Sequence, residues 1–364
     1  MENGNLHSDF LIVGGGVIGL SSALDLARAG ARVTVLERVV CGAESSWAGG
    51  GILSPLLPWD YTEPVTRLTQ WSAARYPAWV DEIAASSGID PEYRQSGMLV
   101  LPDYDESDAD EWCASHQVRL EKRRAHDIAS ALARDDASLW LPEVAQVRNP
   151  RLVKALRRAF EREGGRVVEH AEVTGICLDG NTVSRLETSA GPFSAGHYVI
   201  AAGAWSKPLL GEYAPPLDLK PVCGQMLLFK VEPGLLQQIV IQSGFYLIPR
   251  ADGHILAGST LEDVGFAKRT TVEARLELHA KAAALLPVLK NLAPVRHWVG
   301  LRPGSPENIP VIARHPEIEN LYLNSGHFRY GVTMAPASAH ILANLIFQRI
   351  QPFDVSSYDW PAMR

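Results

Sequence analysis

Six consecutive residues near the start of the chain have the spacing of a phosphate-binding loop. They run Gly-Gly-Gly-Val-Ile-Gly, so that Gly14, Gly16 and Gly19 fit the pattern GxGxxG. In such a loop the first glycine permits the tight turn, the second lets a pyrophosphate approach the backbone, and the third lets helix and strand pack closely. Glu37 follows near the expected spacing of about 20 residues, where a carboxylate accepts hydrogen bonds from ribose hydroxyls. These residues predict dinucleotide binding without a 2′-phosphate; the alternative is a structural glycine turn.

The segments on both sides of this loop must position it. Residues 9–13 form a short apolar run typical of a central parallel strand that is buried on both faces. Residues 20–29 carry apolar side chains at helical spacing and end at Gly30, a residue type favoured after helix C-termini. Residues 31–36 are a second apolar run and predict the next strand. Strand, glycine turn, helix and strand form the context in which GxGxxG binds phosphates at a helix N-terminus.

A run of small and polar residues follows, where a nicotinamide-binding enzyme would continue its alternation of helices and strands. It extends over residues 41–52, and hydroxyl and backbone groups this close to a pyrophosphate suit a bulky second ring system. Gly203, within residues 199–205, and the glycine-bounded segment 326–331 come later in the chain. With these features, the chain resembles the D-amino-acid oxidase superfamily of flavoproteins from about residue 9 to residue 350.

Three late segments are similar to signatures of one branch, the glycine oxidase family of the thiamine pathway. They are residues 245–250 (Phe-Tyr-Leu-Ile-Pro-Arg), 300–304 (Gly-Leu-Arg-Pro-Gly) and 326–333 (Gly-His-Phe-Arg-Tyr-Gly-Val-Thr). The resemblance implies an α/β fold, α+β overall, in which a Rossmann-like FAD-binding domain is interleaved with an antiparallel-sheet substrate domain. It also implies FAD held noncovalently. The glycine motif and the resemblance together place at the FAD Gly14, Gly16, Val17, Ile18, Gly19, Glu37, Arg38, Ser45, Ser46, Gly50, Gly51, Ile52, Val173, Gly203, His327, Phe328, Arg329, Tyr330, Gly331, Val332 and Thr333.

The resemblance also implies three substrate-binding residues. Arg302 matches the family's carboxylate-binding arginine, Tyr246 its carboxylate-contacting tyrosine, and Arg329 a second arginine beside the substrate. A guanidinium can bind a carboxylate through charge-assisted hydrogen bonds worth roughly 1.5–3 kcal/mol. The alternatives are an internal salt bridge for Arg302, a half-buried strand tyrosine for Tyr246, and a contact with the flavin alone for Arg329. No acid or base catalyst is assigned, and no metal site is expected.

A helix is predicted over residues 335–347, with Pro336 in its first turn. Its N-terminus and the amides of residues 331–333 can stabilise negative charge, which reduced flavin acquires near N1 and C2=O. We therefore expect this segment to favour flavin reduction. The alternative is a plain packing helix, which explains the apolar side chains but not the glycine-rich lead-in.

Composition argues against several other classes of protein. The chain has 364 residues, a net charge of −7 and a pI near 5.9, so a broad basic surface for nucleic acid is not expected. No apolar run approaches the roughly 18 residues that span a bilayer, and the N-terminal segment lacks the basic start of a signal peptide. We expect a cytoplasmic protein without a membrane partner.

The four cysteines are too far apart for a CxxC pair or a zinc knuckle, and we expect reduced and mostly buried thiols. No cysteine follows Cys223. Sarcosine oxidases of the same superfamily attach their flavin to a cysteine thiol, so this distribution favours noncovalent FAD.

The motif positions require two interleaved domains. The predicted FAD-binding domain takes residues 1–88, 145–215 and 296–364, and the predicted substrate-binding domain takes residues 89–144 and 216–295. The substrate domain thus consists of two inserts.

Caps and alternation predict the remaining elements. Helices are expected over residues 64–87, from Asn149 as N-cap to about residue 164, and from the capping box of Thr270 and Glu273 to about residue 286. Asp252 and Gly253 predict a hairpin turn. Further strands are expected over residues 94–101, 166–168, 173–178, 196–201, 222–231, 239–242, 245–249 and 254–257.

We therefore expect an FAD-dependent amine oxidase that acts on glycine and on small amines such as sarcosine, N-ethylglycine and D-alanine. Its products would be the 2-oxo acid (glyoxylate from glycine), ammonia or an amine, and hydrogen peroxide formed from molecular oxygen. The resemblance further implies a homotetramer and a role in supplying the glycine imine for thiazole formation in thiamine biosynthesis. Two alternatives stay open: a D-amino-acid dehydrogenase that passes electrons to a quinone, and a non-catalytic FAD-binding protein.

Overall fold

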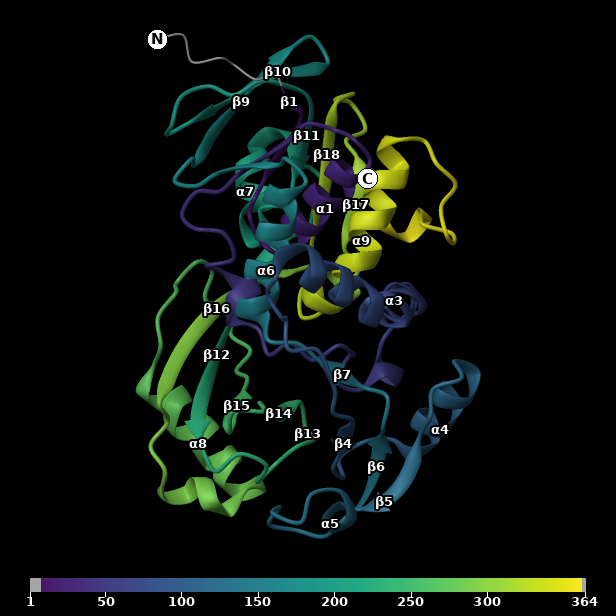
Figure 1. Cartoon of the computed structure of the whole chain (residues 1–364), viewed down its shortest axis with the longest axis vertical. Helices are drawn as coiled ribbons and strands as arrows, with labels where there is room; N and C mark the ends of the chain where they lie inside the picture. The colour runs from purple at the N-terminus through teal and green to yellow at the C-terminus, as the bar shows by residue number, and fades with distance from the viewer. Residues whose placement is uncertain (1–7, 362–364) are drawn as a thin grey trace.

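The computed structural model describes residues 8–361, in which a six-stranded sheet carries the glycine loop (Figure 1). Its order is β17-β18-β11-β1-β2-β8, and all neighbouring strands are parallel except β17 and β18. Strand β1 lies between β11 and β2 and is buried from Phe10 to Val13, as the apolar run predicts. The strands are β1 (Ser8–Val13), β2 (Val33–Leu36), β8 (Arg166–Val168), β11 (Ala195–Ile200), β17 (Val311–Arg314) and β18 (Leu321–Ser325).

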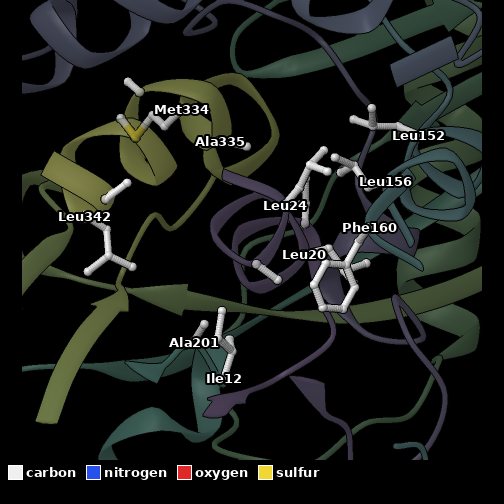
Figure 2. Close-up of a cluster of buried hydrophobic side chains, with 14 of the residues drawn as sticks. Ile12, Leu20, Leu24, Leu152, Leu156, Phe160, Ala201, Met334, Ala335 and Leu342 are labelled. Atoms are coloured by element: carbon white, nitrogen blue, oxygen red, sulfur yellow. The ribbon is translucent and has the colours of Figure 1, made fainter. Parts of the chain in front are cut away.

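Helices cover one face of this sheet and form its largest core. Three of them, α1 (Val17–Arg28), α6 (Asn149–Arg162) and α9 (Gly331–Ile346), contact strands of the sheet, and α3 (Glu63–Ser87) packs on α6 and α9. Figure 2 shows Leu20 and Leu24 of α1 between Phe160 of α6 and Leu342 of α9, with Ile12 of β1 beneath them. Because this core joins helices that are far apart in the sequence, the glycine loop depends on the late helix α9 for its packing.

The other face of the sheet is covered by a separate hairpin. Strand β9 (Val173–Asp179) pairs with β10 (Thr182–Thr188), and both pack with Leu11 and Val13 of β1 and with α7 (Ser206–Leu210). Residues 173–178 therefore form a strand, as predicted, but one that lies on the parallel sheet instead of extending it.

An eight-stranded sheet lies in the lower half of the molecule in Figure 1. Its order is β16-β12-β15-β14-β13-β4-β6-β5, and its pairs are antiparallel except for β13 and β4. The Asp252–Gly253 turn joins β14 to β15, as predicted. The strands are β4 (Met98–Val100), β5 (Glu121–Arg124), β6 (Ala137–Leu141), β12 (Lys220–Lys230), β13 (Ile239–Gln242), β14 (Phe245–Pro249), β15 (His254–Gly258) and β16 (Arg296–Gly304).

Shorter elements complete the fold. Helix α8 (Val272–Leu285) packs on the eight-stranded sheet, and α2 (Ser45–Ala48) lies against both β16 and α6. The others are β3 (Arg94–Gln95), β7 (Ala145–Gln146), α4 (Glu106–Ser115) and α5 (Ala125–Ile128). The predicted fold class, a Rossmann-like parallel sheet joined to a largely antiparallel one, is confirmed.

Helix α9 begins at Gly331, four residues before the predicted start, so Pro336 lies inside it. A proline there cannot donate to the carbonyl of Val332, and two side chains of α3 compensate. The hydroxyl of Tyr76 donates to the Val332 carbonyl at 3.0 Å, and the N–H of Ala337 donates to Ser72 Oγ at 3.1 Å. The helix extends through the proline because these distant partners satisfy its backbone.

Two predicted caps were wrong by one residue. Asn149 is the first residue of α6, and Arg148 takes the N-cap position without a side-chain cap. Helix α8 begins after Thr271, whose hydroxyl accepts from the N–H of Ala274 at 3.2 Å, and not after Thr270.

The strand predicted over residues 94–101 is interrupted at Gly97. Gly97 has φ +65°, and a Cβ there would overlap the Trp140 ring, so the chain turns between β3 and β4. Strand β16 hydrogen-bonds to β12, so Arg296–Gly304 lies in the eight-stranded sheet although the sequence-based division groups it with the FAD-binding segments. The division into domains stays a prediction.

Candidate active site

The glycine loop joins β1 to α1 and requires glycine at its first and last positions. Gly14 has φ +113°, and a Cβ there would lie 2.5 Å from the carbonyl oxygen of Ala201 on the neighbouring strand connection. A Cβ at Gly19 would overlap the Gly14 carbonyl, so helix and strand are packed as closely as the motif implies. Between them, Val17 donates its N–H to Ser46 Oγ at 2.9 Å. The glycine loop thus lies beside residues 41–52, the run of small and polar residues.

Glu37 lies directly after β2 and lines the same cavity as Gly14 and Gly16 of the glycine loop. Its Oε2 accepts from the N–H of Gly15 at 2.8 Å, and its Oε1 accepts from the N–H of Val39 at 3.1 Å. These backbone bonds fix the carboxylate next to the glycine loop. Each carboxylate oxygen can accept a further hydrogen bond, so Glu37 stays able to accept from a ribose hydroxyl.

Arg38 borders the same end of the cavity. Its guanidinium lies over the Trp205 ring at 3.7 Å and forms an ion pair with Glu44 at 2.7 Å. Lys268 also pairs with Glu44 at 2.7 Å, and the Phe266 ring packs on Trp205 with centroids 5.6 Å apart. The loop between β15 and α8 therefore contacts the margin of the cavity at the end where the glycine loop lies.

One cavity of about 430 Å³ joins these groups to the eight-stranded sheet. Its size is in the range of cofactor and ligand pockets. Gly19 and Thr333 do not line it: Gly19 packs on the loop, and Thr333 Oγ1 donates to the Ile52 carbonyl at 3.0 Å. The predicted residues that line it are Gly14, Gly16, Val17, Ile18, Glu37, Arg38, Ser45, Ser46, Gly50, Gly51, Ile52, Val173, Gly203, Tyr246, Arg302, His327, Phe328, Arg329, Tyr330, Gly331 and Val332.

Arg302, on β16, is held by neutral acceptors. Its Nη2 donates to Ser259 Oγ at 2.7 Å, and its Nη1 faces the carbonyl oxygens of Thr260 at 3.3 Å and Cys223 at 3.4 Å. Within residues 8–361 no carboxylate forms an ion pair with it, which contradicts the internal salt bridge considered as its alternative role. Burial lowers the pKa of its guanidinium, yet an arginine stays charged in proteins. The cavity therefore contains a cation without a protein counter-charge.

Tyr246 and Arg329 lie close enough to influence Arg302. The hydroxyl of Tyr246 raises the pKa of the Arg302 guanidinium and the positive charge of Arg329 lowers it, both against the larger effect of burial. Tyr246 is buried on β14, and Arg329 is partly exposed in the turn before α9. Two strands and one turn, distant in the sequence, thus bring three residues predicted to bind substrate to one cavity.

The turn before α9 contains a buried neutral histidine. His327 is 1% exposed, its Nε2 lies 2.8 Å from Ser338 Oγ, and burial lowers its pKa to about 3. The uncharged ring connects the turn to the body of α9. This bond holds residues 328–332 at the cavity wall.

Sequence reasoning missed Asn149 and Met226 among the residues that line the cavity. Met226 is next to Tyr246, whose hydroxyl lies 3.9 Å from its Sδ, and alternation along β12 could have indicated its direction. Arg250 shares a strand face with Tyr246 but lies outside the cavity wall. Its guanidinium donates to the carbonyls of Gly50 at 2.7 Å and Val147 at 2.9 Å, so it fixes the glycine-rich segment to β14.

A family model described as FAD dependent oxidoreductase matches residues 9–345. The chain belongs to this family. The glycine oxidase of Pseudomonas aeruginosa is 43% identical over 353 residues, which cover 96% of this chain and 97% of that protein. A protein of Synechocystis named bifunctional protein ThiO/ThiG is 33% identical and matches over 52% of its own length. The crystal structure of glycine oxidase from Geobacillus kaustophilus superposes with a TM-score of 0.91 at 28% identity, covering 97% of this chain and 98% of that one.

Membership of this family confirms the resemblance predicted from the motifs and makes FAD the cofactor. The cavity fits that group. Val17 begins helix α1, and the N-terminus of a helix can bind phosphate. Beside it, Gly16 leaves the cavity open, because a Cβ at this position would lie 3.0 Å from Ser46 Oγ and would narrow the cavity. No helix in the described part of the chain is long and apolar enough to cross a bilayer. Residues 8–361 also contain no cluster of three or more potential metal ligands.

Proposed function

We propose that this protein oxidises glycine and other small amines, with FAD as the first electron acceptor and molecular oxygen as the second. The observation that carries the proposal is the unpaired Arg302 cation in the cavity. Arg302 is partly buried, a charge withdrawn from water is costly unless a partner compensates it, and a substrate carboxylate is the partner that suits a guanidinium. The similarity to glycine oxidases over nearly the whole chain supports the same reading.

The chain's own residues would bind and orient the amino acid. Arg302 binds the carboxylate, Tyr246 donates its hydroxyl to it, and Arg329 adds a second positive charge. FAD, when bound, accepts a hydride from the α-carbon of the amine. Fixing the carboxylate restricts the orientation of that α-carbon, so positioning supplies most of the catalysis and no side chain is assigned as acid or base.

Overall, glycine, oxygen and water give glyoxylate, ammonia and hydrogen peroxide. The CH–NH2 group of glycine loses two electrons and two protons and becomes the C=NH group of the imine. Oxygen takes up the two electrons and two protons and becomes peroxide, and water hydrolyses the imine to glyoxylate and ammonia. Arg302, Tyr246 and Arg329 together form the carboxylate clamp. Met226 and Leu56 pack with Tyr246 in one apolar cluster beside the clamp, which suits small side chains. Sarcosine, N-ethylglycine and D-alanine therefore belong to the proposed substrate range.

The proposal extends to how the cofactor is held and where the reaction is used. The cavity-lining residues include no cysteine, which supports noncovalent FAD. All four cysteines are free, two buried and two partly buried, which suits the cytoplasm. The relatives named ThiO/ThiG support a supply of the glycine imine for thiazole formation in thiamine biosynthesis. The homotetramer is proposed from the family resemblance alone.

The test is anaerobic mixing of the FAD-loaded protein with glycine, sarcosine or D-alanine, followed by admission of oxygen. We expect the flavin to bleach with the amine and to recolour with release of peroxide. Bleaching without rapid recolouring by oxygen, but with recolouring by a quinone, would indicate the dehydrogenase. No bleaching with any amine would indicate a non-catalytic FAD protein.

A pair of variants tests the clamp. Arg302→Met removes the charge from the cavity, whereas Arg296→Met removes an exposed charge from the same strand. We expect the first to raise the KM for glycine roughly 10- to 100-fold, the loss of its charge-assisted hydrogen bonds, and the second to leave KM unchanged. An unchanged KM in Arg302→Met would show that the carboxylate binds elsewhere.

A further inference from the structure

The side chain of Asn149 lies against the glycine-rich segment that lines the cavity. A Cβ at Gly51 would stand 2.5 Å from its Oδ1, and a Cβ at Gly49 would stand 2.9 Å from its Nδ2. Asn149 is fully buried, belongs to the cavity lining, and occupies the first position of α6. Its amide is therefore enclosed between two glycines, the N-terminus of a helix and the cavity.

Neither polar atom of this amide has a hydrogen-bond partner among the described residues. Buried polar atoms are paired in more than about nine cases in ten, and an unpaired one is destabilising. Asn149 also does not cap the helix, because the N-cap position belongs to Arg148 and no side chain caps the helix. Asn149 thus has one donor, Nδ2, and one acceptor, Oδ1, without partners at a position that lines the cavity.

The position of Asn149 along the cavity limits which part of the cofactor it can reach. The pyrophosphate site lies at the N-terminus of α1, around Gly16 and Val17. Gly50, between the two glycines that touch Asn149, lies toward the clamp, because a Cβ there would stand 3.6 Å from the Tyr246 ring. Asn149 therefore lies against the segment that connects Ser46, the hydrogen-bond partner of Val17 in the phosphate loop, to Gly50 beside Tyr246. The groups of FAD that belong there are the ribityl chain and the isoalloxazine ring.

We infer that the carboxamide of Asn149 binds FAD directly, through one donated and one accepted hydrogen bond to its ribityl–isoalloxazine part. Ribityl hydroxyls donate and accept, and the pyrimidine edge of the ring presents an N–H beside carbonyl oxygens, so both offer the complementary pair. A carboxamide carries both functions in one planar group, whereas a carboxylate cannot donate. The inference rests on FAD binding, and not on the choice of amine in the proposed function.

The test uses Asn149→Leu, which keeps the approximate volume and removes both polar atoms, and Asn149→Asp, which removes the donor. Asn291→Leu removes an exposed amide as the matched control. FAD is titrated into each apoprotein by flavin fluorescence, the thermal midpoint of each apoprotein is measured, and the reduction potential of bound flavin is determined. We expect both Asn149 variants to raise the Kd for FAD roughly 5- to 100-fold, the loss of one or two hydrogen bonds. The apoprotein of Asn149→Leu should be at least as stable as the unmodified one.

The outcomes distinguish the two parts of FAD. A raised Kd with a changed reduction potential would assign the bonds to the ring, and a raised Kd with an unchanged potential would assign them to the ribityl chain. An unchanged Kd in both variants would overturn the inference, as would a Kd that changes only in proportion to lost apoprotein stability. Because the readouts are binding and potential, failure of the amine-oxidation proposal would leave this result interpretable.

Discussion

Gly224 gives the Arg302 guanidinium the space it occupies. The two residues lie on neighbouring strands, where Gly224 pairs with Gly300 and Arg302 pairs with Val222. A Cβ at position 224 would overlap the guanidinium, which is otherwise fixed by Ser259. The orientation of the clamp thus depends on a missing side chain as much as on the hydrogen bonds that arginine makes.

We expect Gly224→Ala to displace the guanidinium and to weaken its binding of the substrate carboxylate. The KM for glycine should rise on the order of 10-fold, the value of one charge-assisted hydrogen bond, while the Kd for FAD stays unchanged. Steady-state kinetics would measure the change in KM, with Gly175→Ala on β9 as the control. A Cβ at position 175 meets only ordinary contacts at 3.7 Å or more. Equal KM values in the two variants would contradict the argument.

The turn between β18 and α9 contains a side chain whose protonation state affects the stability of the turn. Its His327 is neutral and fully buried, with Ser338 Oγ as the partner of Nε2. Protonation would place a charge where no residue among 8–361 supplies a counter-charge, and burial therefore lowers the pKa of His327 to about 3. The same turn supplies Phe328 and Arg329 to the cavity wall, so its stability and the site are linked.

The pKa of His327 predicts a pH dependence of stability. It is about 3 in the folded state against about 6.5 for an unfolded histidine, so the unfolded chain binds the extra proton between those values. The contribution of neutral His327 to stability is therefore complete above about pH 6.5 and falls as the pH decreases, by about 2 kcal/mol between pH 7 and pH 5. Asp25, whose pKa burial raises to about 7, contributes in the opposite direction over the same range. Urea unfolding of the FAD-loaded protein and of His327→Gln at pH 7, 6 and 5 would measure the difference.

Four other histidines, His197, His297, His315 and His340, also have pKa values lowered by burial and shift the stability in the same direction. Only the difference between the protein and its His327→Gln variant isolates the turn. Parallel pH profiles for the two proteins would show that His327 does not contribute.

At the scale of the whole molecule, both sheets contribute to one cavity. The parallel sheet supplies the glycine loop and Glu37, and the eight-stranded sheet supplies Tyr246 and Arg302. A cofactor that contacts the first sheet and borders the second should stabilise both together. The packing of α2 against β16 and α6 adds a direct connection.

We expect FAD to raise the stability of the whole chain in one transition. At a free concentration of one hundred times its Kd the stabilisation is about 2.7 kcal/mol, which for a chain of this length raises Tm by about 3–4 °C. Calorimetry of apoprotein with FAD, and with riboflavin as a control that lacks the adenosine diphosphate half, would measure it. Two transitions of which only one moves with FAD would show that the sheets unfold independently.

How much of this could be predicted from the sequence depends on how local the cause is. The glycine loop, Glu37 and the turn before α9 are contiguous motifs, and the residues they predict, except Gly19 and Thr333, line one cavity. The continuation of α9 through Pro336 could not be predicted, because Tyr76 and Ser72 complete its backbone from a distant helix.

Other misses have the same physical origin. The interruption at Gly97 depends on the Trp140 ring, and Arg250 finds its acceptors in Gly50 and Val147, far away in the sequence. Asn149 carries a residue type that is common at N-caps, so only its unpaired amide atoms reveal another role. In each case the role of the residue depends on a tertiary contact that the neighbouring sequence does not indicate.

The strand order of the parallel sheet has a consequence for biosynthesis. β1 is made first, but its neighbour β11 and the next strand, β18, are made from residues 195–200 and 321–325. Helix α9, which packs on α1, leaves the ribosome about 300 residues after the glycine loop, an interval of roughly 15–60 s at typical translation rates. Until α9 is made, the cavity beside the loop lacks the residues of the turn before α9. We therefore expect FAD to bind only after α9 has been made, and yellow colour in a nascent-chain preparation would report chains that extend through α9.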